Sequence, residues 1–508
     1  MKKETIILLS TVLIKFILQF TLIAPEYELH RDEYLHLDQA HHLALGYASV
    51  PPITSITSLC IYLLGNSVFW VKFFPAMYGA LTILFVWKTI KRLNGNLYAL
   101  ILGSCCILFS ALLRLNTLYQ PNSLDVLCWT GFFYFLISYI YTNKPKYIYF
   151  TAIIFAIGFL NKYNILFLVL GVTPALLATK ARCIFTKREI YLAILLALIL
   201  ITPNLYWQYQ NNFPVVTHMK VLSKTQLIHV NRLDFLLGQI SFFTGSLLVI
   251  LASLIALFLY APFKKYKFLG LTFITILLIF TYFKAKDYYA IGLYPIYIAF
   301  GAVYLTNLLE KNKRNYISLL LIAIPVAIFF PMYTIAFPNQ SADYIAKHSN
   351  IYKDYGLLRW EDGKDHEIPQ DYADMLGWKE LATKVADAYD KLPNSNATLI
   401  LCDNYGQAGA INYYTNNRLK ANTFEADYIN WFQLNKPYKN FIRIKSQQNL
   451  DDEMQVTSPY FEKSYIADSI TNKYAREHGT TIFVFEKASI NISERLKEEI
   501  IDYKKQNN

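Results

Sequence analysis

A short polar stretch, residues 31–42, gathers acids and imidazoles in a chain that is otherwise largely apolar. If this stretch is helical, Asp32 and His36 are four residues apart, as are Asp38 and His42, so the members of each pair share a face. A carboxylate beside an imidazole can act as a general base, hold a metal ion or form a plain surface salt bridge. The residue types leave all three interpretations open.

Further ionisable and phenolic groups gather at three other places, each beside the expected end of an apolar segment. They are Arg114, Asp125, Lys162, Lys284, Lys286, Asp287, Tyr288 and Tyr289. Charges at such positions are costly in a membrane and by default mark a site inside a helix bundle. Lysines can also snorkel to the lipid headgroups, and paired tyrosines are typical of the aromatic belts of membrane proteins.

An acid and several cations around one outward-facing cavity suit a transfer reaction. The carboxylate would remove a proton from an acceptor hydroxyl, and the cations would stabilise a departing phosphate. A transport pathway could use the same groups, because paired charges also bind and release a substrate. Periodicity and charge do not separate these two functions.

A divalent metal is a further possibility for the polar stretch, although we expect that no cofactor is required. The stretch contains hard and borderline ligands, and their spacing matches no closed zinc site. The possible ligands are Glu33, His36, Asp38, His41 and His42.

The composition identifies a membrane protein. The 508 residues are 55% hydrophobic and 16% aromatic, with a mean hydropathy of +0.27, whereas a soluble domain is about 45–50% apolar. The first apolar segment, residues 6–24, is long enough to cross a bilayer and is interrupted by Lys15 and Gln19. Its basic start at residues 1–3 also fits a signal peptide, but further spans follow at once, which favours an uncleaved anchor.

The apolar pattern predicts about eleven α-helical crossings. The predicted runs are 6–24, 66–88, 97–113, 123–142, 147–160, 163–179, 190–206, 236–259, 268–283, 288–306 and 316–335. One set of alternate loops holds most of the lysines and arginines, which predicts that these loops and the N-terminus are cytoplasmic. Residues 25–52, the loop 207–235 and everything after about residue 336 are then expected on the outer face. The net charge of +12 is mainly this topology signal, so we expect no nucleic-acid partner.

The chain becomes polar after Pro338, which predicts two domains, residues 1–337 with a first outer loop at 25–65, and residues 338–508. The second is expected to be an α/β soluble domain, with a helix from Gly377, a strand at 397–402 and another at 480–485. Asn404 is a plausible helix cap after the first of these strands. The glycines Gly406 and Gly409 could let the backbone approach an acceptor or let the helix pack closely.

The order of short motifs resembles a known family. Asp32-Glu33, then Gly46-Tyr47 and Pro51-Pro52, look like the signature of bacterial family 39 glycosyltransferases, relatives of protein O-mannosyltransferases and of lipid A aminoarabinose transferase. The resemblance covers nearly the whole chain. Its other motifs are Tyr119-Gln120-Pro121-Asn122, Asn161-Lys162-Tyr163, Pro203-Asn204-Leu205-Tyr206-Trp207, Phe213-Pro214, His218, Lys286-Asp287-Tyr288-Tyr289-Ala290, Tyr294-Pro295, Gly377-Trp378 and residues 404–410.

The resemblance implies a helical membrane bundle of the GT-C type in a bacterial inner (plasma) membrane. It implies transfer of a hexose or pentose from a polyprenyl phosphate, on the outer side, to a glycan, lipid or protein acceptor. Asp32 would be the catalytic acid residue and Glu33 its neighbour. The donor phosphate would be bound by Lys284, Lys286, Tyr288, Lys162 and Arg114, and acceptor-binding or structural roles would fall to Asp125, His36, His42 and Tyr289.

The chain also departs from the family pattern at two positions. Val50 stands directly before the two prolines, where relatives often carry a basic residue or histidine, and Asn122 follows Pro121, where many have aspartate. Together these departures leave room for an inactive family member that acts as a scaffold. A transporter or flippase for a lipid-linked substrate, which could use the same charged groups, is the other alternative to a transferase.

Overall fold

The computed structural model describes residues 3–225, 230–447 and 452–507. The chain forms two compact units. Unit 1 comprises Met1–Leu22, Val50–Thr54 and Phe69–Phe337, and unit 2 comprises Ile23–Ser49, Ser55–Val68 and Pro338–Asn508. Met1 and Lys2 of the expected basic start, and residues 226–229 of the loop expected on the outer face, lie outside the described residues.

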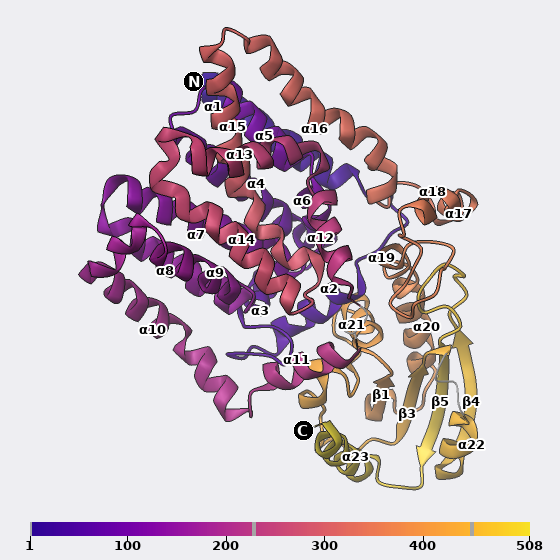
Figure 1. The fold of residues 1–508 in the computed structure, drawn as a ribbon. Helices are drawn as coiled ribbons and strands as arrows, with labels where there is room; N and C mark the ends of the chain where they lie inside the picture. Colours follow the sequence, from indigo (N-terminus) through magenta and orange to yellow (C-terminus); the bar gives the residue numbers. More distant parts are fainter. Residues whose placement is uncertain (1–2, 226–229, 448–451, 508) are drawn as a thin grey trace. The chain divides into compact units, whose positions relative to one another are not determined.

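Unit 1 is built from helices. They are α1 Lys3–Thr21, α4 Val68–Arg92, α5 Leu97–Leu108, α6 Ala111–Leu115, α7 Pro121–Thr142, α8 Pro145–Asn161, α9 Ile165–Leu177, η2 Lys180–Thr186, α10 Arg188–Gln210, α11 Pro214–Thr225, α12 Arg232–Ser241, η4 Thr244–Ser246, α13 Leu247–Leu259, η5 Ala261–Tyr266, α14 Lys267–Tyr282, η6 Asp287–Leu293, α15 Tyr294–Lys311 and α16 Asn315–Ala336. Figure 1 shows these helices in indigo to salmon, many of them side by side.

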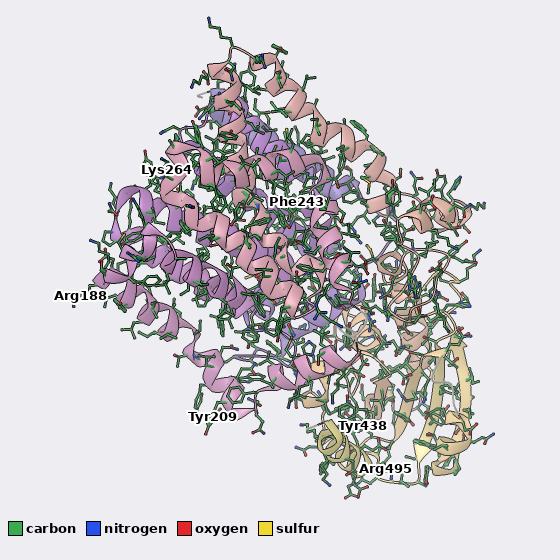
Figure 2. All side chains as sticks on the ribbon, viewed as in Figure 1. Arg188, Tyr209, Phe243, Lys264, Tyr438 and Arg495 are labelled. Carbon is green, nitrogen blue, oxygen red and sulfur yellow. The ribbon has the colours of Figure 1, made fainter. Side chains whose placement is uncertain are left out.

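Two helices form the centre of unit 1. The most apolar window of α7 is 89% buried and that of η6–α15 is 83% buried, whereas the values for α10 and α16 are 28% and 22%. Arg188 and Tyr209 mark the two ends of α10 in Figure 2. Most of the exposed side chains of α10 are apolar, such as Leu195 and Ile199, as expected for a helix that contacts lipid.

The described residues contain fewer long spans than the sequence predicts. Six helices are long and apolar enough to cross a membrane, and eight if two pairs bent by 107° and 66° each count as one span. Every one of the eleven predicted apolar runs contains a helix. The numbers differ because some runs form helices of fewer than 18 residues, including α5 and α8, and others break within the run. The chain is a multi-pass membrane protein.

Unit 2 combines helices with one sheet. Its elements are α2 Arg31–Asp38, η1 Gln39–His41, most of α3 Ile53–Leu63, α17 Ala342–Lys347, α18 Ser349–Asp354, α19 Gln370–Ala373, α20 Trp378–Asp390, η7 Ser395–Ala397, β1 Thr398–Cys402, α21 Tyr405–Tyr414, β2 Ala421–Asn422, η8 Ala426–Asn430, β3 Asn440–Lys445, α22 Glu453–Thr457, η10 Ser458–Tyr460, β4 Phe461–Ser469, β5 Thr481–Ala488 and α23 Ile492–Asn507.

The sheet has the strand order β2-β1-β3-β5-β4. Strand β1 pairs in parallel with β2 and β3, with Ile400 opposite Ala421 and Ile442. Strand β5 pairs antiparallel with β3 and β4, and Figure 1 shows β3, β5 and β4 side by side. All five residues of β1 are buried, as expected for a strand between two parallel neighbours.

The predicted α/β class of the C-terminal part is confirmed, and several elements lie where expected. The strand at 397–402 is β1, the strand at 480–485 is β5, and the helix from Gly377 is α20. Asn404 caps α21, because its side-chain oxygen accepts from the backbone N–H of Gln407 (3.0 Å). The grouping differs in one respect, since most of residues 25–65, expected with the membrane domain, fall in unit 2.

Candidate active site

Helix α2 begins at the polar stretch and is closed at its start by two reciprocal hydrogen bonds. The side chain of His30 accepts from the backbone N–H of Asp32 (3.2 Å). The carboxylate of Glu33 accepts from the backbone N–H of His30 (2.7 Å). Together they form a capping box. Glu33 is fully buried, so its carboxylate has a structural task at the helix start.

Asp32 lies in the first turn of α2, and its side chain is 36% exposed. Its Oδ1 accepts from the hydroxyl of Tyr405 (2.7 Å), the first residue of α21. The guanidinium of Arg31 lies 4.6 Å from the ring centre of the same tyrosine. We call Asp32, Tyr405, Arg31 and His30 the acid site.

Positive groups dominate the electrostatics of Asp32. Burial by itself would raise the pKa of Asp32, but His30 and Arg31, together with the hydrogen bond from Tyr405 and the nearby His36, lower this pKa below its usual value. Asp32 is therefore ionised at neutral pH and can accept a proton.

Two glycines of α21 allow α2 to lie against it. A Cβ on Gly409 would come within 2.8 Å of Tyr34 Cβ and of the Tyr428 hydroxyl. A Cβ on Gly406 would come within 3.2 Å of Arg31 Cβ. The contacts of the two helices thus favour the packing role of these glycines, and they bring a C-terminal helix to the helix that carries Asp32.

Replacing Gly409 with alanine is expected to destabilise unit 2 by about 1–3 kcal/mol, because the added methyl group overfills the contact between α2 and α21. Hydrogen exchange of the full chain, followed by mass spectrometry, should show faster exchange in peptides from α2. Gly131→Ala is the matched control, since its Cβ would meet its nearest neighbours at 3.4 Å. Equal exchange of α2 in wild type and Gly409→Ala would contradict this packing role.

The end of α2 is fixed by a second acid. Asp38 Oδ2 accepts from Asn412 Nδ2 (2.6 Å) and from the Tyr428 hydroxyl (2.7 Å). Asp38 is buried, and burial raises its pKa to about 6, although both hydrogen bonds oppose the shift. Helix α2 ends at Asp38 and residues 39–41 form a 3₁₀ turn. The predicted pairing of Asp38 with His42 on one helical face is therefore wrong.

Replacing Asp38 with asparagine is expected to flatten the pH dependence of stability. The pKa of Asp38 is about 6 in the folded chain and about 3.9 when unfolded, so the folded state binds more protons between these values. Asp38 therefore contributes on the order of 3 kcal/mol to the free energy of unfolding. This contribution is fully present below about pH 4 and is lost as the pH rises through 6. Thermal unfolding between pH 4 and 7 should show Asp38→Asn gaining stability relative to wild type. A constant difference across this range would contradict the assignment.

The histidines of the polar stretch have separate surroundings. His42 stacks on Trp431, with ring centres 4.1 Å apart and planes 7° apart. His41 lies within 2.7 Å of Asn417 Nδ2. His36 is buried, and burial lowers its pKa. Across residues 3–225, 230–447 and 452–507, no group of three or more His, Cys, Asp or Glu could hold a metal ion.

In unit 1, Lys162 follows helix α8 and lies beside two tyrosines. Its Nζ is 4.6 Å from the ring centre of Tyr289 and 5.2 Å from that of Tyr288. The same Nζ donates to Asn122 Oδ1 (2.7 Å) at the start of α7. We call Lys162, Tyr288 and Tyr289 the lysine–tyrosine cluster. The ammonium and the phenol hydroxyls are donors of the kind that bind anionic oxygens.

Asp125 supports this cluster from α7. Its Oδ1 accepts from Trp129 Nε1 (3.1 Å) and its Oδ2 from Asn164 Nδ2 (2.9 Å). Asn164 Nδ2 also donates to the backbone carbonyl of Tyr289 (2.9 Å). Asp125 is buried, and these bonds tie α7, the start of α9 and η6 together.

The other predicted phosphate-binding residues are Lys286, Lys284 and Arg114. Lys286 acts on the cluster through its charge: burial lowers the pKa of Lys162 to about 8, the charge of Asp125 opposes this shift, and the charge of Lys286 adds to it. Lys284 has a left-handed backbone (φ 52°), and within the described residues its side chain makes no hydrogen bond, ion pair or ring contact. Arg114 lies in the last turn of α6, and its Nη1 donates to Thr117 Oγ1 (2.7 Å).

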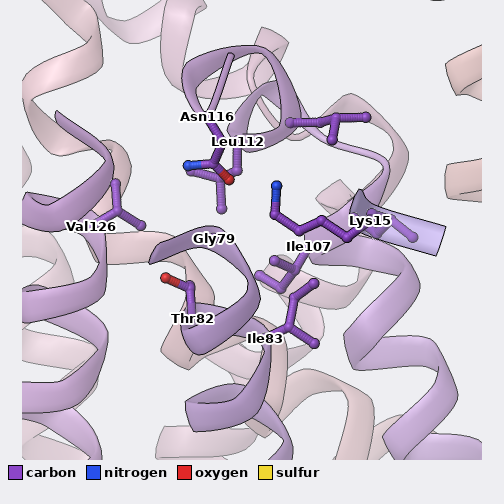
Figure 3. Close-up of a pocket in the computed structure, with 10 residues that line it drawn as sticks. Lys15, Gly79, Thr82, Ile83, Ile107, Leu112, Asn116 and Val126 are labelled. Carbon is purple, nitrogen blue, oxygen red and sulfur yellow. The ribbon is translucent and has the colours of Figure 1, made fainter. Parts of the chain in front are cut away.

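A separate cavity in unit 1 is lined by none of the predicted site residues. Figure 3 shows the side chain of Lys15, from α1, reaching toward Asn116 above Gly79. Lys15 is 2% exposed, and its Nζ donates to Gln19 Oε1 (2.7 Å) one turn along the same helix. The two polar interruptions of the first span therefore bind each other.

Sequence reasoning missed Tyr405 and His30 as neighbours of Asp32. Tyr405 is 373 residues from Asp32 along the chain, and its only signal is the motif at 404–410. His30 stands two residues before Asp32, but histidine is not among the preferred helix caps.

The comparisons with known proteins agree with this architecture. Residues 49–207 match the model of a family described as dolichyl-phosphate-mannose-protein mannosyltransferase. The lipid A galacturonosyltransferase RgtD of Rhizobium johnstonii is 25% identical over 206 residues, which are 39% of this chain and 42% of that protein. The chain thus spans less than half the length of this curated relative.

Two crystal structures of ArnT from Cupriavidus metallidurans share the fold over nearly the whole chain. The structure bound to undecaprenyl phosphate has a TM-score of 0.63 and 13% identity, and covers 94% of this chain and 97% of that chain. The apo structure has a TM-score of 0.64 and 14% identity, and covers 96% and 98%. The family match and the curated relative make the chain similar to glycosyltransferases of family 39, and the likeness to the two ArnT structures shows that it has their GT-C fold.

Proposed function

We propose that the chain is a membrane glycosyltransferase that moves a hexose or pentose from a polyprenyl phosphate to an extracytoplasmic acceptor. The observation that carries the proposal is an ionised, partly exposed Asp32 held at the start of α2 in a chain with this family likeness. The names of the relatives support the reaction class, since both the family description and the curated relative are sugar transferases.

The lysine–tyrosine cluster is proposed to bind the donor phosphate. Lys162 supplies a positive charge, Tyr288 and Tyr289 supply hydroxyl donors, and Lys286 adds charge nearby. Charge-assisted hydrogen bonds to phosphate oxygens are about twice as strong as neutral ones. An ArnT structure contains undecaprenyl phosphate, which supports a lipid phosphate as the donor carrier here. Lys284 and Arg114 are secondary candidates.

We propose that the reaction is one displacement with inversion at the sugar carbon, with Asp32 as the base and the polyprenyl phosphate as the leaving group. The acceptor oxygen forms a bond to C1 of the sugar while Asp32 takes the hydroxyl proton. The bond between C1 and the phosphate oxygen breaks, and its electron pair leaves with the polyprenyl phosphate. A phosphate leaves more easily than an alcohol, so one carboxylate suffices and no general acid is required.

The acceptor is proposed to be an envelope glycan, a lipid A or core saccharide, or a protein. The curated relative acts on lipid A, according to its name, which supports the lipid A alternative. The distribution of lysine and arginine supports a cytoplasmic N-terminus and reaction on the outer side of a bacterial inner membrane.

The purified full-length chain, incubated with polyprenyl-phosphate sugars and a membrane extract, tests this function. Mass analysis of lipids, glycans and proteins should reveal an acceptor heavier by one hexose or pentose. A flippase would instead move the labelled lipid across vesicles without a covalent product, and a scaffold would do neither. Parallel reactions with a chelator test the metal alternative. We expect the same yield of transferred sugar with and without the chelator.

A further inference from the structure

The hydroxyl of Tyr405 is the group that joins the C-terminal helix α21 to Asp32. Its hydrogen bond to Asp32 Oδ1 is 2.7 Å long. Tyr405 itself is held at two other points. Its backbone N–H donates to Glu425 Oε2 (3.3 Å), and its ring lies 4.6 Å from the guanidinium carbon of Arg31. A phenol that is fixed at its backbone and its ring presents its hydroxyl in one direction.

The backbone of Asp32 is fixed from the other side. His30 Nδ1 accepts from the Asp32 N–H (3.2 Å). The other ring nitrogen of His30, Nε2, lies 3.7 Å from Asp374 Oδ2. Asp374 in turn accepts from Arg476 at 3.1 and 3.2 Å. Both His30 and Asp374 are buried, so the start of α2 has little freedom to turn.

We propose that Tyr405 is a positioning residue for Asp32: its hydroxyl fixes the rotation of the carboxylate so that the carboxylate is aimed at the acceptor hydroxyl. The inference rests on the proposed function of Asp32 as general base. A base must lie within hydrogen-bond reach of the proton it removes, and a carboxylate that rotates freely spends less time in that geometry.

The charges around Asp32 add a pH signature to this role. His30, Arg31 and His36 face Asp32 from its own helix, Tyr405 faces it from α21, and Asp374 lies beyond His30. The hydroxyl of Tyr405 is one of the groups that lower the pKa of Asp32. Its removal should therefore raise the pH at which Asp32 takes up a proton.

Tyr405→Phe tests the proposal, because it removes one hydroxyl and keeps the ring beside Arg31. We expect kcat to fall about 10- to 100-fold, the scale of a hydrogen bond to a charged group. The KM for the donor should stay unchanged, and the acid limb of the pH profile should shift toward higher pH. Tyr413→Phe is the matched control. It lies on the same helix, and its hydroxyl donates to the Asn66 carbonyl (2.9 Å).

A second readout is independent of sugar transfer. Carbodiimides react with protonated carboxyl groups, so labelling of Asp32 in the full chain, located by mass spectrometry across a pH series, reports its protonation. Labelling should extend to higher pH in Tyr405→Phe, and a more acidic fluorinated tyrosine at position 405 should shift it to lower pH. Unshifted labelling in both variants would overturn the proposal, even in an active enzyme. If the pH dependence of Asp32 labelling shifts but the chain transfers no sugar, the hydrogen bond between Tyr405 and Asp32 is supported and the proposed function is refuted.

Discussion

Replacing Asp32 with asparagine is expected to lower the turnover of sugar transfer by about 10²–10⁴-fold, the usual contribution of acid–base assistance. Asparagine has nearly the same shape and still offers an oxygen to the Tyr405 hydroxyl, so the helix start should persist. The lost property is the negative charge that accepts the proton. The KM for the donor should change little, because Asp32 is assigned to the acceptor. Initial rates with a fixed donor and a varied acceptor measure the effect.

Asp427→Asn is the control for this experiment. Asp427 is a second buried acid of unit 2, where its Oδ1 accepts from the backbone N–H of Ala48 (2.7 Å). The same chemical change at this position should leave turnover within about twofold of wild type. Normal turnover in Asp32→Asn would reject the role of Asp32, whereas equal losses in both variants would indicate damage to unit 2.

Replacing Lys162 with methionine is expected to weaken donor binding by about 10- to 100-fold, because a hydrogen bond to a charged group contributes about 1.5–3 kcal/mol. Methionine keeps most of the length of the side chain beside Tyr288 and Tyr289 but removes the charge. Titration of the purified chain with polyprenyl phosphate in detergent measures the affinity without relying on turnover. The kcat/KM for the donor should fall in parallel.

Lys146→Met is the matched control for Lys162→Met. Lys146 lies at the opposite end of α8, near its start, and its Nζ is 5.3 Å from the ring centre of Tyr147. A lysine over a tyrosine is thus removed in both variants, yet only Lys162→Met should lose donor affinity. The variant Lys284→Met, measured in parallel, shows which of the two lysines contributes more to donor binding. We expect it to lower donor affinity less than Lys162→Met does. Unchanged affinity in Lys162→Met would contradict the phosphate assignment.

Local sequence patterns predicted much of the fold. All eleven apolar runs contain helices, and the buried strand β1 and the Asn404 cap lie where turn and strand signals predict them. The number of spans was harder to predict, because composition does not reveal where a helix bends. Helices Arg232–Ser241 and Thr244–Leu259 meet at a bend within the predicted run 236–259, and Ile165–Leu177 and Lys180–Thr186 meet at a bend at the end of the run 163–179.

The candidate site depended on contacts that no local pattern contains. Helical spacing paired Asp38 with His42, but α2 ends at Asp38, which is buried against Asn412 and Tyr428. The neighbour of Asp32 is likewise a distant residue, Tyr405. Long-range hydrogen bonds of this kind arise from tertiary packing, and a single sequence signals them only through a family resemblance.

Within unit 1, the order of motifs predicted the members of the lysine–tyrosine cluster. Lys162 and Tyr288 come from motifs more than a hundred residues apart, and the structure brings them together. The motif did not separate Lys286, which influences Lys162, from Lys284, whose backbone turns left-handed two residues earlier. The expected juxtaposition of Asp32 with these cations stays a prediction.

The most direct test of the central claim is the stoichiometry of transfer. The purified full-length chain is incubated with a defined polyprenyl-phosphate sugar and a purified acceptor, and mass spectrometry quantifies both products. Our account predicts one freed polyprenyl phosphate for each acceptor that gains a sugar, and almost neither product from Asp32→Asn in the same time. A donor that remains intact, or sugar transfer that proceeds equally well without the Asp32 carboxylate, would contradict it.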